Sequence, residues 1–416
     1  MNFLSPRSFS TLFFFLPWSA LASCVVFTMA FPLAAQQSGV WILLGSALAF
    51  GLPHGACDLW AMQRAAQRED ATQQNLGDKT SSTRTAVYRR KIPSSAKWMA
   101  AYIGAALTML LLWRVHAPLA LAVFLGLTVW HFGSADAWLH RILCLAPNAS
   151  ATNASATNAS ATDISANASV NATTYGANRN DTFSRWLLAW GRGIFVISAP
   201  LALQPRETHE ILQRFAKLSG ANHDIASWWQ FALPTLFLGI VLQGAGHAAS
   251  LRERTSSTRM SGRSDYRIAR APIWTRWDSA LWLETLALLL LFALVPPLLA
   301  VACYFLAMHS WRHLLRLEMF GSCDAAKQRN AETSGDFDQT SLFDSMRFAL
   351  RAVVQQHRHS WLLAMITLVG IVPILALWPS LLQGALQWNT AYLVLISAVT
   401  VPHVTVVSWL EAHHNL

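Results

Sequence analysis

Long apolar segments separated by short polar ones run the length of the 416-residue chain. Most of them hold about 20 residues, the length that crosses the hydrocarbon core of a bilayer as a helix. We expect helices over residues 11–33, 41–60, 98–115, 118–139, 186–203, 228–247, 279–295, 297–315, 360–378 and 388–410. The pattern predicts an all-α fold: a polytopic membrane helix bundle of about ten transmembrane helices, forming one integral membrane domain over residues 1–416.

The composition supports a multi-pass membrane protein, for which we expect the cell (inner) membrane. Charged residues make up 12% of the chain, against roughly 25% in ordinary globular domains, and apolar residues make up 54%. The first apolar segment is interpreted as a retained helix rather than a signal peptide, because it is long and only Arg7 precedes it. The five cysteines are odd in number and show no CxxC spacing, so no disulfide framework is expected.

Basic residues concentrate in three predicted connections, residues 61–97, 248–278 and 316–358. In a chain of ten helices these loops lie on the same side, and the positive-inside rule assigns that side to the cytoplasm. Both termini are then cytoplasmic as well. The basic residues form no single patch, so the net charge of +10 does not indicate a nucleic-acid partner.

A low-complexity stretch interrupts the apolar pattern. Between Asn148 and Asn171 the chain repeats Asn-Ala-Ser-Ala-Thr, which offers no apolar face to bury. We therefore predict a disordered insertion over residues 141–185, in a cytoplasmic loop. Its matches to the N-x-[ST] glycosylation pattern are interpreted as by-products of the repeat.

Five histidines fall near the middle of predicted helices. They are His54, His131, His309, His313 and His403. At ~1.5 Å rise per residue, their depths differ by only a turn or so, and their helices all run in the same direction. Because polar side chains at membrane depth are costly, five of them at matched depth predict a shared metal or cofactor site.

Other polar residues near these histidines are candidates for a supporting role. Asp58 follows His54 by four residues and Asp136 follows His131 by five, and a carboxylate often accepts the second N–H of a ligating imidazole. The alternative is that the aspartates cap helix ends or pair with Arg312. His247 is expected nearer the cytoplasmic end of its helix, at the rim of the site.

The residues leave several kinds of site open. Imidazole ligands suit zinc, copper, iron and nickel, and the pair His309 and His313 encloses no glutamate of a zinc-hydrolase motif. A haem-binding protein, a di-iron oxidoreductase of the desaturase or hydroxylase type, and a proton-coupled transporter are all alternatives. Among the metal sites, a single four-histidine iron with positions open to O₂ fits best.

Four motifs together resemble a known family. They are Gly-Leu-Pro-His-Gly-Ala-Cys-Asp at 51–58, Trp-His-Phe-Gly at 130–133, His-Ser-Trp-Arg-His at 309–313, and Pro-His at 402–403. The combination is similar to the Brp/Blh family of bacterial and archaeal β-carotene 15,15′-dioxygenases. The departures from the family lie mainly in loops.

The resemblance implies a function and a ligand set. It implies that iron(II), Fe(2+), on a membrane enzyme splits the central double bond of β-carotene with O₂, and that two retinals result. It also implies that the lipid bilayer supplies the substrate and a rhodopsin-type protein receives the product. His54, His131, His309 and His313 would be the iron ligands, and His403 either an alternative ligand or a residue lining the site.

Overall fold

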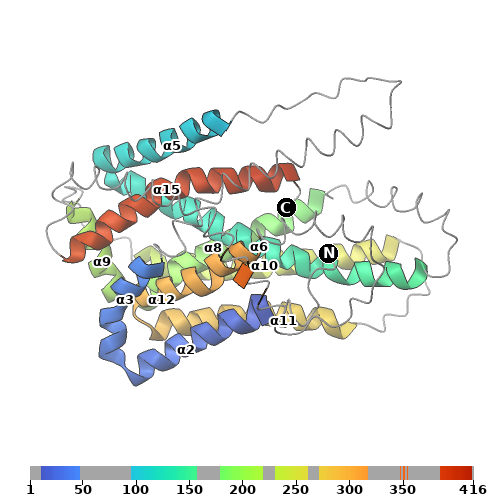
Figure 1. The fold of residues 1–416 in the computed structure, drawn as a ribbon. Coiled ribbons are helices and arrows are strands. Elements are labelled where there is room, and N and C mark those ends of the chain that lie inside the picture. Colours follow the sequence, from blue (N-terminus) through green and yellow to red (C-terminus); the bar gives the residue numbers. More distant parts are fainter. Residues whose placement is uncertain are drawn as a thin grey trace. The chain divides into compact units, whose positions relative to one another are not determined.

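The computed structural model describes residues 11–46, 95–156, 179–218, 230–260, 271–316 and 385–414, with residues 347, 350, 351 and 354. Every element in these ranges is helical and none is a strand, which confirms the all-α prediction (Figure 1). Five of the described helical segments are long and apolar enough to cross a membrane: Thr11–Ala30, Ala117–Leu139, Phe183–Leu203, Ala232–Arg252 and Pro297–Arg316. The count of ten helices and the cytoplasmic location of both termini stay predictions.

The chain divides into two compact units. Unit 1 comprises residues 1–127, 210–225 and 294–416, and unit 2 comprises residues 128–209 and 226–293. In unit 1 lie η1 (Thr11–Phe15), α2 (Leu16–Ala30), α3 (Pro32–Ser46), α5 (Ser95–Val115), α12 (Pro297–Cys303), η4 (Tyr304–Ser310) and α15 (Ala385–His414). Unit 2 holds α8 (Arg179–Leu203), α10 (Ala232–Met260) and most of α11 (Ala271–Leu294), while α6 (Ala117–Ala156) begins in unit 1 and continues into unit 2.

Prolines set two helix boundaries. The first predicted helix ends at Ala30, because Phe31 has a non-helical backbone (φ −136°, ψ 65°) and Pro32 opens α3. The residue before a proline is driven out of the α region by contact with the proline ring. The predicted boundary between the helices 279–295 and 297–315 is confirmed at Pro296 and Pro297, with α11 ending at Leu294 and α12 starting at Pro297. Pro297 is well suited to this position, since the first turn of a helix needs no N–H from it.

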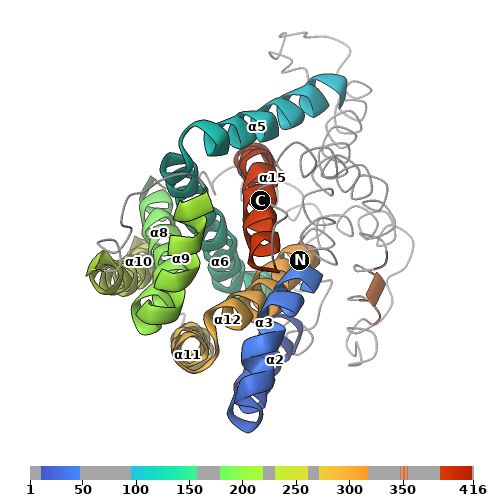
Figure 2. The same ribbon diagram turned by 90° about the vertical axis from the view of Figure 1, so that its left-hand side faces the viewer.

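Close packing and buried hydrogen bonds join the helices of unit 1. α12 packs on α3, where a Cβ at Gly39 would lie 3.1 Å from the backbone nitrogen of Leu299. α15 packs on α5, which crosses above the upper end of α15 in Figure 2, and Trp113 donates its indole N–H to the Ser397 hydroxyl at 2.6 Å. The indole hydrogen bond is enclosed by an apolar cluster that includes Met109 and Val394.

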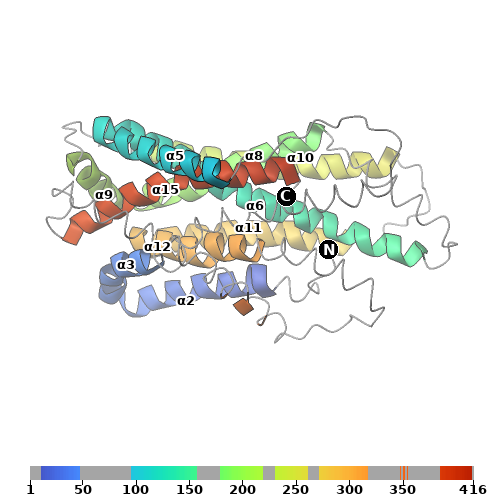
Figure 3. The same ribbon diagram turned by 45° about the horizontal axis from the view of Figure 1, so that its top comes forward.

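Glycines set the packing of α8 on α10 in unit 2 (Figure 3). A Cβ at Gly191 would overlap the backbone nitrogen of Gln243, and one at Gly239 would lie 2.7 Å from the backbone nitrogen of Phe195. Small residues allow two helix backbones to approach closely, which is how membrane helices gain van der Waals contact without help from water.

Several helices extend beyond the predicted spans. α6 continues to Ala156 and α8 begins at Arg179, so both enter the segment 141–185 that was predicted as an insertion; residues 157–178 lie outside the described ones. Alanine has the highest helix propensity, and a helix already nucleated by its apolar part extends at little cost. α10 and α11 likewise enter the predicted connection 248–278.

One described helix was not expected. α9 (Pro205–Leu218) lies between the predicted helices 186–203 and 228–247, where no helix was expected. Its charged residues, among them Arg206 and Glu210, interrupt any long apolar segment, whereas its apolar residues recur at helical spacing. A search for unbroken apolar segments misses such an amphipathic helix. The predicted span 360–378 and most of 41–60 lie outside the described residues, as do most of the connections 61–97 and 316–358.

The packing of α2 on α12 can be tested through two free cysteines. Cys24 on α2 and Cys303 at the end of α12 have their Sγ atoms 3.0 Å apart. Mild oxidation with copper–phenanthroline should therefore remove their two thiol hydrogens and join the two residues within one chain. Peptide mapping by mass spectrometry should find the cross-linked pair in wild type and in Cys144→Ser, and lose it in Cys24→Ser. A different pairing would contradict this packing.

Candidate metal centre

Two of the predicted ligands lie on one helical stretch of unit 1. His309 belongs to η4, a π-helical segment, and His313 follows after the chain returns to α-helix over residues 311–316. π-Helical turns are rare and occur frequently at functional sites. The two imidazole rings are 6.4 Å apart between centroids and nearly parallel, with 23° between their planes. Their spacing of four residues thus brings the rings side by side.

A third imidazole reaches this pair from α15. The His403 ring lies 5.7 Å from that of His313, at 67° to it. His309, His313 and His403 are 4%, 3% and 4% exposed, and Phe305 stacks on the other side of His309 at 5.9 Å. We call His309, His313 and His403 the imidazole group. Three buried imidazoles from two distant parts of the sequence are therefore gathered within one unit.

The imidazole group consists of donors that suit a metal ion, and its rings lie close to one another. With imidazole–metal bonds of about 2.1 Å, two rings on one ion reach a centroid separation of roughly 6.5 Å only when they lie on opposite sides of the ion. The separations of 6.4 and 5.7 Å lie near this upper limit. No group of three His, Cys, Asp or Glu side chains in ligand geometry is found among the described residues, and His54 and Asp58 lie outside them. The donor type suits a metal, whereas the described residues alone do not form a metal site.

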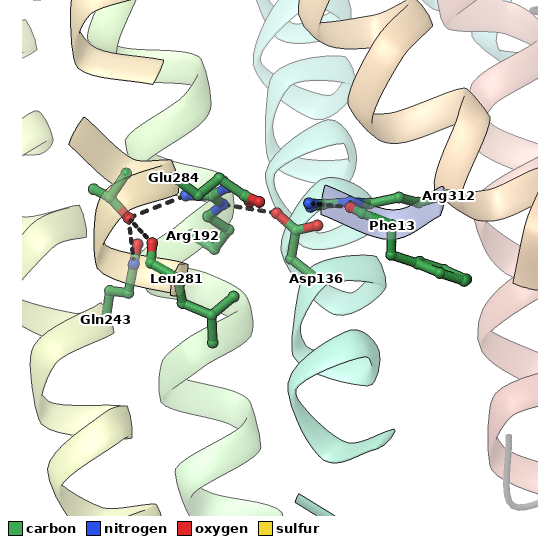
Figure 4. Close-up of polar contacts among 8 residues, drawn as sticks. Phe13, Asp136, Arg192, Gln243, Leu281, Glu284 and Arg312 are labelled. Atoms are coloured by element: carbon green, nitrogen blue, oxygen red, sulfur yellow. Dashed lines mark hydrogen bonds and ion pairs between the residues drawn. The ribbon is translucent and has the colours of Figure 1, made fainter. Parts of the chain in front are cut away.

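Contacts with η1, called the N-terminal turn below, fix the helical stretch that carries His309 and His313. Trp311 donates its indole N–H to the Leu12 carbonyl at 2.8 Å. Arg312 donates from Nε and Nη2 to the Phe13 carbonyl at 3.1 and 3.0 Å, drawn at the right of Figure 4. The Arg312 guanidinium also lies 5.5 Å from the Phe14 ring centroid, a cation–π contact. Because Trp311 and Arg312 stand between His309 and His313, these bonds fix the rotation of that stretch.

The fourth predicted ligand, His131, lies in unit 2 on α6 and is also buried. Two close contacts with α8 bracket it. A Cβ at Gly193 would overlap the Val129 carbonyl oxygen, and a Cβ at Gly133 would overlap that of Ala189. α8 therefore touches the α6 backbone two residues before His131 and two residues after it. These contacts determine the position of the His131 backbone.

An ion-pair network joins α6, α8 and α11 in unit 2 (Figure 4). Arg192 donates from Nε to Asp136 at 2.7 Å and from Nη2 to Glu284, which is 0% exposed. Arg192 Nη1 also donates to the Thr285 hydroxyl at 3.2 Å, and Gln243 donates to the same oxygen at 2.8 Å. Buried charges need such partners, because removal of one member of a buried ion pair typically lowers the free energy of unfolding by about 3–5 kcal/mol.

Arg192 and Glu284 were not predicted as partners in such a network, although the sequence carries a signal for them. Each is an ionisable residue inside a long apolar segment, a position that is costly unless it is paired or used. Asp136 was expected to support a ligand or to pair with Arg312, and the structure pairs it with Arg192. His247, expected at the rim, lies buried on α10 with its ring 5.6 Å from that of Trp282.

The described part of the chain is thus an all-helical protein with membrane-length helices and a buried group of imidazoles. The family model described as BCD, beta-carotene 15,15'-dioxygenase, matches residues 46–411, so the chain belongs to this family. This confirms the resemblance carried by the four motifs. The match includes all the candidate site residues.

One curated relative supports the same family. The protein named probable beta-carotene 15,15'-dioxygenase Blh, from Halobacterium salinarum (strain ATCC 700922 / JCM 11081 / NRC-1), is 30% identical over 230 residues. The alignment covers 53% of this chain and 54% of the relative, so the chain spans about half the length of the relative. No solved structure matches the chain.

The close approach of α8 to α6 makes Gly193 sensitive to substitution. Gly193→Ala should lower the free energy of unfolding by about 1–3 kcal/mol, because the new methyl group would meet the Val129 carbonyl. Gly126→Ala, on the same helix as His131, meets nothing within 4 Å and should keep or slightly raise stability, because alanine favours a helix more than glycine does. Thermal unfolding of both variants in detergent measures the difference, and equal stability would contradict the close contact.

Proposed function

We propose that the chain cleaves the central 15,15′ double bond of β-carotene with O₂ to give two molecules of all-trans-retinal. The observation that carries the proposal is the imidazole group, buried in a chain that belongs to the dioxygenase family. His309 and His313 lie in a helical segment of membrane length, and His403 lies in a shorter apolar one. A carotenoid is a long apolar rod that resides in the bilayer. An enzyme acting on its centre gains from a reactive site at membrane depth.

The proposed cofactor is Fe(2+), held by His54, His131, His309 and His313. His403 is either an alternative ligand or a residue that lines the site, and its ring is close enough to that of His313 for both roles. Neutral imidazoles leave the charge of such an ion uncompensated, so Asp58 is proposed as a supporting carboxylate. Asp136, the other predicted carboxylate, is paired with Arg192 instead. When bound, iron supplies the reactivity toward O₂ that protein side chains lack.

The chain itself has three tasks in this reaction: to hold the ligands, to orient the polyene and to exclude water. The bonds of Trp311 and Arg312 to the N-terminal turn serve the first task for His309 and His313. Buried apolar side chains next to the imidazole group, Met308 and Leu314 among them, serve the last. Exclusion of water protects a reactive site from side reactions.

The wider setting is proposed from the same family relationship. β-Carotene dissolved in the lipid bilayer would reach the site laterally, and retinal would leave by the same medium. A retinal-binding protein of the rhodopsin type would consume the product. The membrane concerned is proposed to be the cell (inner) membrane, which fits the apolar helices.

Expression in a bacterial host that accumulates β-carotene tests the activity. Wild type should bleach the pigment and yield retinal on chromatography, whereas His309→Ala should leave pigment and retinal at the level of the empty vector. His209→Ala, on α9 and outside the imidazole group, should behave as wild type. Undiminished pigment beside well-expressed wild-type protein would refute the proposed activity.

Metal removal tests the cofactor separately. Purified protein should contain about one iron per chain, as expected of a single mononuclear site. An iron(II) chelator should abolish retinal formation, and Fe(2+) should restore it while Zn(2+) should not, because zinc has no redox chemistry. Elemental analysis and retinal assays on the same samples give the result. Full activity in iron-free protein would exclude an iron enzyme.

A further inference from the structure

A buried hydroxyl next to the imidazole group differs from other hydroxyls of the described helices. Thr28, Ser198 and Thr400 donate to the backbone carbonyl four residues earlier, at 2.9, 2.6 and 2.6 Å. Such bonds are how serine and threonine normally satisfy a hydroxyl inside a membrane helix. Ser310 is 1% exposed, and its Oγ has no hydrogen-bond partner within the described protein.

The π-helical register of η4 explains why Ser310 differs. η4 runs from Tyr304 to Ser310, and its turns are wider than those of an α-helix. The carbonyls of the preceding turn are therefore displaced from the position that a serine hydroxyl reaches in an α-helix. A buried hydroxyl without a partner has lost its bonds to water and gained none in return. In a packed interior alanine would fill nearly the same volume without this cost.

The position of Ser310 suggests what the hydroxyl binds. It directly follows His309 and precedes His313 by three residues, a spacing that puts two side chains on neighbouring positions of one helix surface. His313 in turn contacts the ring of His403. A hydrogen-bond donor thus stands on the helical turn that carries two of the three clustered imidazoles.

We propose that Ser310 is a ligand-binding residue of the imidazole group. Its hydroxyl donates a hydrogen bond to a small oxygen-bearing ligand held there, either O₂ or water. Such a ligand would supply the hydrogen-bond partner that the described protein does not provide for Ser310. The choice of O₂ rests on the proposed function, whereas the binding role of the hydroxyl rests on its burial and position.

Nitric oxide, which binds ferrous iron in the manner of O₂, provides a direct probe. In iron-loaded protein, Ser310→Ala should raise the dissociation constant of nitric oxide about three- to tenfold, the usual effect of one lost hydrogen bond. Ser310→Thr, which keeps the hydroxyl, should restore most of the affinity. Ser198→Ala is the matched control, because that hydroxyl is buried but bonded to the Ile194 carbonyl.

The unfolding temperature supplies a second readout. If Ser310 had a purely structural role, its replacement by alanine would lower this temperature. Ser310→Ala should keep or raise the unfolding temperature, since it removes a buried group without a partner, and Ser198→Ala should lower it. Wild-type affinity for nitric oxide in Ser310→Ala would overturn the proposal, and so would a loss of stability accompanied by loss of iron.

The same samples separate this proposal from the proposed function. Wild-type protein that binds iron and nitric oxide but leaves β-carotene intact would refute the proposed activity alone, and the Ser310 comparison would still be decisive. Wild-type protein that binds no iron would overturn both. A higher KM for O₂ in Ser310→Ala, with the KM for β-carotene unchanged, would support O₂ rather than water as the ligand.

Discussion

Polar groups buried at membrane depth must find their partners inside the protein, and this constraint shapes both units. Neither lipid nor an apolar core can bond them, so each must be paired or serve a function. Arg312 is satisfied by two hydrogen bonds to the Phe13 carbonyl. Arg192 is satisfied by the carboxylates of Asp136 and Glu284 and by the Thr285 hydroxyl. The imidazole group is the set of buried polar residues for which a ligand is proposed.

The two arginines show how this pairing also serves positioning. Arg312 lies between His309 and His313 and ties that stretch to the N-terminal turn. Arg192 links Asp136, five residues beyond His131, to Glu284 on α11. In each unit a buried guanidinium therefore fixes a helix that carries a histidine. A ligand that is held rigidly keeps its geometry when the metal arrives, which is the advantage of a preorganised site.

Features that depend on local sequence could be predicted. The apolar segments predicted the all-α class, and Pro296 and Pro297 marked the boundary before α12. The four-residue spacing of His309 and His313 accounts for their neighbouring rings. The four motifs pointed to the family that the comparison confirms. In each case the residues that define the feature are close in sequence, or the motif identifies it without knowledge of packing.

Features that depend on tertiary contacts could not be predicted. The π-helical register of η4 and the orphaned Ser310 hydroxyl have no signature in residue order. Glu284 and Arg192 were visible as charges in apolar segments, but their pairing across helices depends on how α8 meets α11. α9 was missed because it is an amphipathic helix, whose apolar residues form one face and no unbroken apolar segment. Only the helical period of those residues indicates it.

X-ray absorption spectroscopy at the iron edge reports the ligands of the ion in the intact protein. An iron site built from these histidines should give a first shell of nitrogen at about 2.1 Å, with the outer-shell scattering of several imidazoles. Loss of His313 should reduce that imidazole scattering. A sulfur shell, the signature of a porphyrin, or a spectrum without imidazole scattering would contradict an iron site built from these histidines.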